Sequence, residues 1–261
     1  MDLKLAGKSA LITGASKGIG LSAARVLAAE GCTRLHLAAR NGEALNAARQ
    51  ELEAQYDVAV HVHPMDLGAA GSMEVLADAV GEIDILVNNA GDVPAGPLDT
   101  LSEADWRRGF DLKVFGYILL SRIFYARMKA ASGGVIVNVI GNSGENWDAS
   151  YIAGSTANAA IMSFTKALGG RSLNDGIRVV GINPGPVDTD RMLKIMRRKA
   201  IDMLGDENRW KELYSHYPAG RAATAEEVAD LVAFLASPRS DYTTGTIVTL
   251  DGGIAARGSV I

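Results

Sequence analysis

A glycine-rich turn near the N-terminus constrains the fold of this chain more than any other feature. It reads Thr13-Gly14-Ala15-Ser16-Lys17-Gly18-Ile19-Gly20, after a short apolar run and before an Ala- and Leu-rich segment. Gly14 permits a tight turn, Gly18 lets the backbone approach a pyrophosphate, and Gly20 lets the next helix pack near the strand. The N–H groups at the start of that helix attract phosphate. A glycine turn alone is often an ordinary loop, but between a strand and a helix it predicts a dinucleotide site.

Strand-like and helix-like segments alternate along the whole chain. The runs that predict strands are Ser9–Thr13, Arg34–Ala39, Val58–His63, Ile83–Asn88, Gly134–Ile140, Ile177–Ile182 and Thr246–Leu250. The segments with helical periodicity are Gly18–Ala29, Glu43–Gln55, Gly71–Val80, Glu103–Lys129, Ala149–Ser172 and Ala225–Ala236. This alternation predicts an α/β fold in which helices cover both faces of a parallel sheet. We expect a single Rossmann-type domain over residues 1–261, with a doubly wound, seven-stranded sheet that binds ligands at the carboxyl ends of its strands.

The segment from Thr189 to Tyr217 has helical character but no strand of its own. Its apolar residues are Met192, Met196, Ala200 and Met203, with Trp210, Leu213, Tyr214 and Tyr217 beyond them. Such a stripe suits a lid over a partly apolar substrate, and it suits a helix packed into the core equally well. The basic residues of the segment are Arg191, Lys194, Arg197, Arg198 and Lys199. They could bind an anionic group, although a solvated helix face also explains them. We interpret residues 189–217 as a helical substrate lid.

Charge and hydropathy exclude several classes of partner. The chain has 26 Lys and Arg residues and 30 Asp and Glu residues, so its net charge is −4. This charge gives no electrostatic reason to expect nucleic acid as a partner. No apolar run reaches the roughly 18 residues that a membrane span needs, and the first residues do not begin a signal peptide. The one cysteine, Cys32, is typical of a reducing compartment and of an unreactive structural thiol. We therefore expect a cytoplasmic protein with no membrane or nucleic-acid partner.

The residue after the second predicted strand bears on the choice of cofactor. This strand is followed by Arg40. A site for NAD places an acidic residue here for the ribose 2′-hydroxyl, whereas an arginine suits the 2′-phosphate of NADP. Arg40, assisted by Lys17 and Ser16, therefore predicts NADP(H), although a solvated arginine would look the same.

Two histidines, His61 and His63, would share one face of the third strand. A metal pair is conceivable, but no carboxylate or cysteine accompanies them in a ligand pattern. We predict structural histidines and no metal site.

Further motifs follow the later strands and complete a recognisable set. They are Met65-Asp66-Leu67, Asn88-Asn89-Ala90-Gly91, Tyr151, Asn183-Pro184-Gly185, Thr189 and Asp251-Gly252-Gly253. With the glycine turn, they resemble the short-chain dehydrogenase/reductase family over nearly the whole chain, although each motif alone could be a turn or a cap. The resemblance implies that Asp66, with Leu67 beside it, binds the adenine, and that Asn89, Ala90 and Gly91 line the cofactor. It also implies that the nicotinamide amide is held by Pro184, Gly185, Val187 and Thr189.

The chain departs from this family in its active-site motifs. The family usually carries Asn, Ser, Tyr and Lys, with the last two as Y-x-x-x-K on one helix. Here Tyr151 is present, but Ser155 stands at the lysine position. Gly141 stands at the serine position, and Ser143, two residues later, could substitute for it. The resemblance therefore implies an atypical member that lacks the usual lysine and serine.

A lysine stands where the resemblance implies the active-site asparagine. Counted from Trp106, that position is Lys113. A free phenol with a pKa near 10 is a poor base at neutral pH, and a cation about 4 Å away is worth roughly 4 kcal/mol at an effective dielectric of 20. Lys113 could therefore replace the missing cation, since a lysine stem is long and flexible. Alternatively, Lys113 extends into solvent and the site is inactive.

Together these features predict an NADP(H)-dependent oxidoreductase that moves hydride between nicotinamide and a small carbonyl or alcohol substrate. We assign Tyr151 as the acid/base, Lys113 as the relocated cation, and Ser143 as a group that binds the carbonyl oxygen. The alternative is a non-catalytic NADP-binding sensor or interaction protein. The resemblance also implies a homodimer or homotetramer, formed through the helices at 103–129 and 149–172.

Overall fold

Seven parallel strands form one sheet in the order β3-β2-β1-β4-β5-β6-β7. The computed structural model describes residues 1–257, except for the side chain of Arg191. The strands are β1 (Ser9–Thr13), β2 (Arg34–Ala39), β3 (Ala59–Pro64), β4 (Ile85–Asn88), β5 (Gly134–Val139), β6 (Ile177–Pro184) and β7 (Ile247–Leu250). The strand order reverses between β1 and β4, which is the switch point at which doubly wound sheets bind ligands. The predicted Rossmann-type sheet is thereby confirmed.

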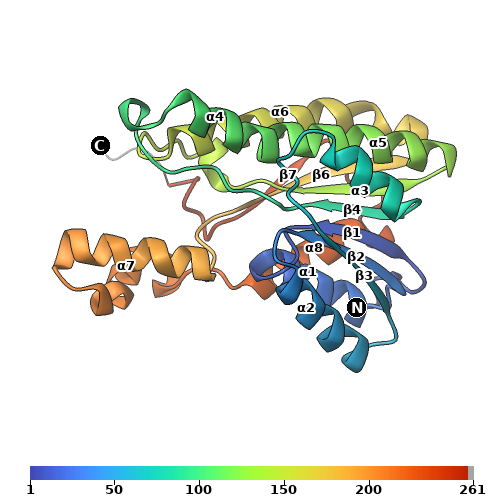
Figure 1. Cartoon of the computed structure of the whole chain (residues 1–261), viewed down its shortest axis with the longest axis horizontal. Helices are drawn as coiled ribbons and strands as arrows, with labels where there is room; N and C mark the ends of the chain where they lie inside the picture. Colours follow the sequence, from blue (N-terminus) through green and yellow to red (C-terminus); the bar gives the residue numbers. More distant parts are fainter. Residues whose placement is uncertain (258–261) are drawn as a thin grey trace.

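Helices cover both faces of this sheet, as Figure 1 shows. One layer consists of α1 (Gly18–Ala29), α2 (Gly42–Gln55) and α8 (Ala225–Ala236). The opposite layer consists of α3 (Ser72–Val80), α4 (Glu103–Phe110), α5 (Gly116–Ala130) and α6 (Ile152–Ser172). Short 3-10 turns lie at Leu98–Thr100 (η1), Asn142–Gly144 (η3), Leu173–Asp175 (η4), Pro218–Gly220 (η6) and Pro238–Ser240 (η7). Of these, η3 follows β5 and borders the candidate site.

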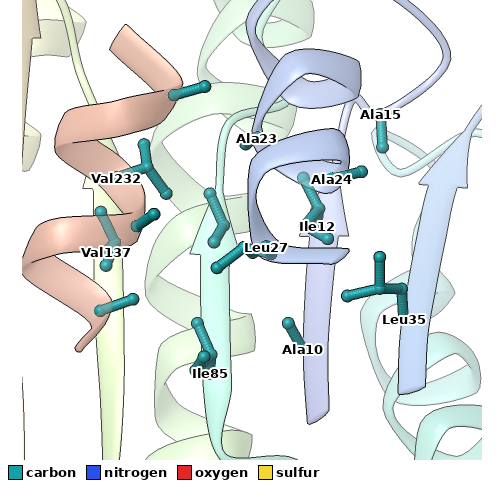
Figure 2. Packing of buried hydrophobic residues seen from close by; sticks show 14 of the residues in the cluster. Ala10, Ile12, Ala15, Ala23, Ala24, Leu27, Leu35, Ile85, Val137 and Val232 are labelled. Atoms are coloured by element: carbon teal, nitrogen blue, oxygen red, sulfur yellow. The ribbon is translucent and has the colours of Figure 1, made fainter. Parts of the chain in front are cut away.

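The apolar strands are buried because helices exclude water from both sides of the sheet. All residues of β1 and β6 are buried, as expected for central parallel strands. Figure 2 shows the α1 side chains of Ala23 and Leu27 packed over Ile12 and Ile85 of the sheet. Small alanine side chains on α1 let the helix lie close to the strands. This packing fixes the start of α1 beside the glycine turn.

A π-helical turn interrupts the helix that the sequence predicts as continuous from Glu103 to Lys129. Residues Asp111–Phe115 (η2) form this turn between α4 and α5. The predicted helical range Glu103–Lys129 is thus confirmed, with a π turn inside it. A π turn holds an extra residue, which alters the faces of the residues around it, and both Lys113 and Val114 are buried there. The distortion thus lies at the lysine that the sequence singles out.

The segment after β6 forms an arm that stands away from the sheet (Figure 1). It contains α7 (Asp190–Leu204) and the 3-10 segment η5 (Glu207–His216). The two elements pack on each other around a separate cluster of Met196, Ala200 and Leu213. Met203, which the sequence places in the same stripe, is 66% exposed and lies outside that cluster. Of the predicted basic cluster, the side chain of Arg191 lies outside the described residues.

Candidate active site

The glycine turn between β1 and α1 has the backbone conformation that its sequence predicts. Gly14 and Gly18 have φ values of 69° and 56°, a region that L side chains rarely adopt. A Cβ at Gly20 would lie 2.5 Å from the carbonyl oxygen of Gly14. The helix α1 begins at Gly18 with no side-chain cap on its first N–H groups. These groups and the positive end of the helix dipole are therefore suited to a pyrophosphate.

The turn after β4 is clamped to the glycine turn by side-chain hydrogen bonds. The Thr13 hydroxyl accepts the N–H groups of Asn89 at 2.9 Å and Ala90 at 3.0 Å. The Asn89 side chain donates to the carbonyl oxygen of Thr13 at 2.9 Å. Asn89 and Ala90 thus hold two turns at the switch point together. Their contact with a cofactor stays a prediction.

The basic side chains near this turn are exposed and paired with carboxylates. Arg40 Nη2 lies 3.2 Å from Asp92 Oδ2, and Lys17 Nζ lies 3.3 Å from Asp190 Oδ2. Exposed pairs of this kind are worth little, so both cations can turn toward a phosphate at small cost. Asp66 is also exposed, and its Oδ1 accepts the N–H of Gly68 at 3.0 Å. Lys17, Arg40, Asp66 and Asp92 follow the carboxyl ends of β1, β2, β3 and β4, in that order.

The loop after β6 is fixed by backbone contacts. The Gly185 N–H donates to Leu250 at 2.9 Å, and Val187 forms an isolated bridge with Ala223. The Thr189 hydroxyl caps α7 by accepting the N–H of Met192. The segment from Pro184 to Thr189 is therefore tied to β7 and to Ala223, and the arm begins directly after it.

Lys113 lies at the carboxyl end of β5. Its side chain is 6% exposed, which excludes the alternative in which it extends into solvent. Its Nζ donates hydrogen bonds to the carbonyl oxygens of Val139 at 2.7 Å and Ile140 at 3.2 Å, and to the Tyr117 hydroxyl at 2.8 Å. A Cβ at Gly91 would lie 3.0 Å from Lys113 Cδ. The three acceptors match the three donors of a lysine ammonium group, which lies between the ends of β4 and β5.

Tyr117, one turn after Lys113, holds this side chain in place. Its hydroxyl donates to the carbonyl oxygen of Val139 at 2.8 Å, and Lys113 Nζ lies 4.4 Å from the centre of its ring. Burial raises the pKa of Tyr117 well above its ordinary value, so the phenol stays protonated. Sequence reasoning missed this residue, although its spacing of four from Lys113 on one helix could have indicated it.

The face of α6 that meets η3 carries Asn158. This side chain is 5% exposed, and its Nδ2 donates to the Ser143 hydroxyl at 2.8 Å. Gly141 has a φ of 134°, and a Cβ there would lie 2.7 Å from Asn158 Nδ2. A side chain at residue 141 and the Asn158 amide therefore exclude each other. Sequence reasoning missed Asn158 because its partners become neighbours only in the folded chain.

Tyr151 is the residue before α6, and its ring lies across Gly154. A Cβ at Gly154 would lie 2.0 Å from both Cε1 and Cζ of this ring. The backbone of Tyr151 forms an isolated bridge with Gly96, and the ring packs against a cluster that contains Val114 and Ile140. The missing side chain at residue 154 thus makes room for the phenol.

Ser155 does not take part in this arrangement as a lysine would. It is buried, and its hydroxyl accepts the N–H of Asp148 at 3.3 Å. Gly154 and Asn158 are four residues apart and share one face of α6. That face, and not the position of Ser155, meets the end of β5.

Asp251 links the closing turn of the chain to η3. Its carboxylate accepts the N–H groups of Gly253 at 2.8 Å and Ala255 at 2.7 Å. It also accepts Asn142 Nδ2 at 3.2 Å. Asn142 is the first residue of η3, so this bond holds the turn that carries Ser143.

The structure thus brings Lys113, Tyr151 and Ser143 to the carboxyl end of β5, beside the glycine turn.

Cys32 and the histidines lie elsewhere. Cys32 is buried, and burial raises the pKa of its thiol to about 12. His36 Nδ1 lies 3.0 Å from His63 Nε2, and within residues 1–257 no group of three or more His, Cys, Asp or Glu side chains is arranged so that it could hold a metal ion. In the same part of the chain, no helix is long and apolar enough to cross a membrane.

Known proteins are similar to this chain over nearly their whole length. Galactitol 2-dehydrogenase (L-tagatose-forming) from Cereibacter sphaeroides is 34% identical over 255 residues, which cover 96% of each chain. L-Sorbose reductase from Gluconobacter frateurii, solved with NADPH and L-sorbose, is similar with a TM-score of 0.91 and 31% identity, over 98% of this chain and 99% of that one. An NAD⁺-bound xylitol dehydrogenase is similar with a TM-score of 0.86 and 26% identity, over 96% of this chain and 100% of that one.

The family model for the short chain dehydrogenases matches residues 8–200, from the start of the sheet into the arm. This range includes the glycine turn, the clamp at Asn89 and the end of β5. Since sequence, strand order and turn geometry agree, the chain belongs to the short-chain dehydrogenase/reductase family of oxidoreductases.

Proposed function

We propose that this protein is an NADP(H)-dependent oxidoreductase that interconverts a carbonyl and an alcohol. The observation that carries the proposal is the buried Lys113 side chain at the end of β5, on the sheet edge where doubly wound folds bind their ligands. When bound, the nicotinamide cofactor supplies or accepts the hydride. The chain's own residues supply the proton and hold the oxygen.

In the direction of reduction, the Tyr151 hydroxyl gives its proton to the substrate carbonyl oxygen as hydride reaches the carbon. The carbonyl becomes an alcohol, and the phenolate then recovers a proton from solvent. In oxidation the phenolate accepts the alcohol proton. The role assigned to Lys113 is to stabilise, by its positive charge, the negative charge that develops on the oxygen atoms during the transfer. Ser143 donates a hydrogen bond to the same oxygen.

The preference for NADP(H) rests on Arg40. It is exposed at the end of β2 and bound only loosely to Asp92, so it can reach a 2′-phosphate. Charge-assisted contacts contribute about 1.5–3 kcal/mol each, which is about tenfold or more in affinity. The L-sorbose reductase with NADPH supports this preference, whereas the xylitol dehydrogenase with NAD⁺ shows that the fold accepts both cofactors.

Titration of NADPH and NADH into the wild type and Arg40→Ala tests the preference. We expect tighter NADPH binding by the wild type and a loss of at least about tenfold in Arg40→Ala, with NADH unchanged. The matched control is Arg34→Ala, which removes an exposed arginine at the other end of β2. Equal affinities in the wild type, or tighter NADH binding, contradict the proposal.

Turnover tests the reaction class. The panel takes L-sorbose, L-tagatose, galactitol and xylitol from the names of the similar proteins. It adds an apolar methyl ketone because the arm carries apolar residues. We expect NADPH oxidation or NADP⁺ reduction with at least one of these compounds, and its loss in Tyr151→Phe. Turnover that survives in Tyr151→Phe would overturn the assignment of the acid/base.

A non-catalytic NADP-binding protein is the second candidate. It is favoured by the hydrogen bonds of Lys113 Nζ to three acceptors of its own chain, which also suit a purely structural role. NADPH binding without turnover on any carbonyl or alcohol would support this candidate.

We further propose a homodimer or homotetramer that uses the outer face of α4, η2 and α5. Phe115 is 51% exposed there, and Trp106 and Phe110 line a hollow beside it. Light scattering tests this interface, and Phe115→Glu should produce monomers.

A further inference from the structure

We propose that Asn158 is a positioning residue, which turns the hydroxyl proton of Ser143 toward the oxygen of a substrate carbonyl. The inference rests on the proposed function, because it concerns the same carbonyl oxygen. It adds a residue that no sequence motif indicates.

The chemistry of an amide nitrogen fixes the direction of the Asn158–Ser143 hydrogen bond. Asn158 Nδ2 can only donate, so Ser143 Oγ uses a lone pair to accept at 2.8 Å. Within residues 1–257, no oxygen accepts the Ser143 proton in turn. The hydroxyl therefore has a proton to donate outside the chain.

Both partners are held in fixed positions. Asn158 is 5% exposed on the helix α6, and its amide occupies the space that a side chain at Gly141 would fill. Ser143 lies on η3, whose first residue, Asn142, is bonded to Asp251 at 3.2 Å. Turning either the amide or the hydroxyl away would break their hydrogen bond of 2.8 Å.

The position of Asn158 relates this hydroxyl to the Tyr151 ring. Gly154, on which the Tyr151 ring lies, is one turn before Asn158 on the same face of α6. The phenol and the serine hydroxyl are thus presented along one helix face at the end of β5. A carbonyl oxygen has two lone pairs and can accept from both donors, which polarises its bond to carbon.

Asn158→Asp tests the inference because it keeps the shape of the side chain and reverses the hydrogen bond. An ionised carboxylate only accepts, so it takes the Ser143 proton away from the substrate. The probe is isobutyramide, an unreactive carbonyl compound, titrated into the NADPH complex while NADPH fluorescence is recorded. At pH 7.5 we expect isobutyramide to bind at least tenfold more weakly to Asn158→Asp than to the wild type, with equal NADPH affinity.

A pH series separates this role from a merely structural one. At pH 5.5 the buried carboxyl group that Asn158→Asp introduces becomes protonated and can donate again, so part of the lost isobutyramide affinity should return. Wild-type affinity should stay constant over this range. Ser143→Ala should lose the same affinity and recover none of it. Asn46→Asp, an exposed change on α2, should behave as the wild type.

Three results would overturn the inference. They are absence of isobutyramide binding by the wild type, equal binding by Asn158→Asp and the wild type at pH 7.5, and a loss in Asn158→Asp that is the same at both pH values. Failure of the proposed function appears separately, as undiminished turnover in Tyr151→Phe, because the amide titration does not depend on turnover.

Discussion

Gly154→Ala is expected to displace the Tyr151 ring and so to lower turnover without unfolding the protein. The new Cβ would lie 2.0 Å from Cε1 and Cζ of the ring. Since ordinary carbon–carbon contacts are about 3.5–4.0 Å, the ring must shift by roughly 1.5–2 Å. A displacement of about 1 Å at a reacting group can cost about 100-fold in rate. We therefore expect turnover to fall by about two decades or more.

Gly170→Ala is the matched control for this change. It lies on the same helix, and a Cβ there meets no atom within 4 Å. Replacement of glycine by alanine in a helix interior stabilises by about 0.5–1 kcal/mol, so Gly170→Ala should unfold at a higher temperature with unchanged turnover. Gly154→Ala should keep its NADPH affinity, because the change leaves the glycine turn and Arg40 as they are.

The measurements are steady-state turnover and NADPH titration of Gly154→Ala and Gly170→Ala. Full turnover in Gly154→Ala would refute the argument that the ring position over Gly154 is needed for catalysis. Equal losses in Gly154→Ala and Gly170→Ala would trace the effect to helix flexibility instead.

Three further predictions concern stability and motion. The pKa of His36 is lowered from 6.5 to about 4, chiefly by burial. Between these pH values the unfolded chain binds more protons than the folded one, so the stability falls as the pH drops. Urea unfolding should show a loss of about 2 kcal/mol between pH 7 and pH 5 that His36→Asn reduces, and an identical slope in this variant would contradict it. Arg178→Met should lower the free energy of unfolding by about 3–5 kcal/mol, because the buried guanidinium donates to the carbonyl oxygens at the end of α8. Urea unfolding measures this change, and Arg122→Met, at an exposed position, should alter the free energy of unfolding little. Amide hydrogen exchange in α7 and η5 should be faster than in β6 and should slow when NADPH and substrate bind; protection equal to that of β6 in the empty protein would argue against a lid.

The fold could be predicted from the sequence because its signals are local. Each strand is a short apolar run, and each helix repeats with its own period, so strand and helix positions agree closely with the structure. The glycine turn likewise depends on residues that are neighbours in the chain. The π turn at Asp111–Phe115 could not be predicted, since the periodicity of the segment is helical throughout.

The candidate site could be predicted only in part, because its pieces meet through tertiary contacts. Lys113 was visible as an unexpected residue at a family position, but its acceptors at the end of β5 come from another element. Asn158 carries no sequence signal, because its partner Ser143 is 15 residues away on a different turn. The contact of Tyr151 with Gly154 also depends on how the loop enters α6.

Turnover of Lys113→Met tests the central claim most directly. Methionine keeps the apolar stem and removes the charge, and a cation that supplies about 3–4 kcal/mol to the transition state is worth roughly two to three decades in rate. We predict a loss of that size with NADPH affinity retained, an equal or larger loss in Tyr151→Phe, and a double variant little worse than either single one. Undiminished turnover in Lys113→Met, on a substrate whose turnover Tyr151→Phe abolishes, would falsify the claim that Lys113 replaces the missing cation.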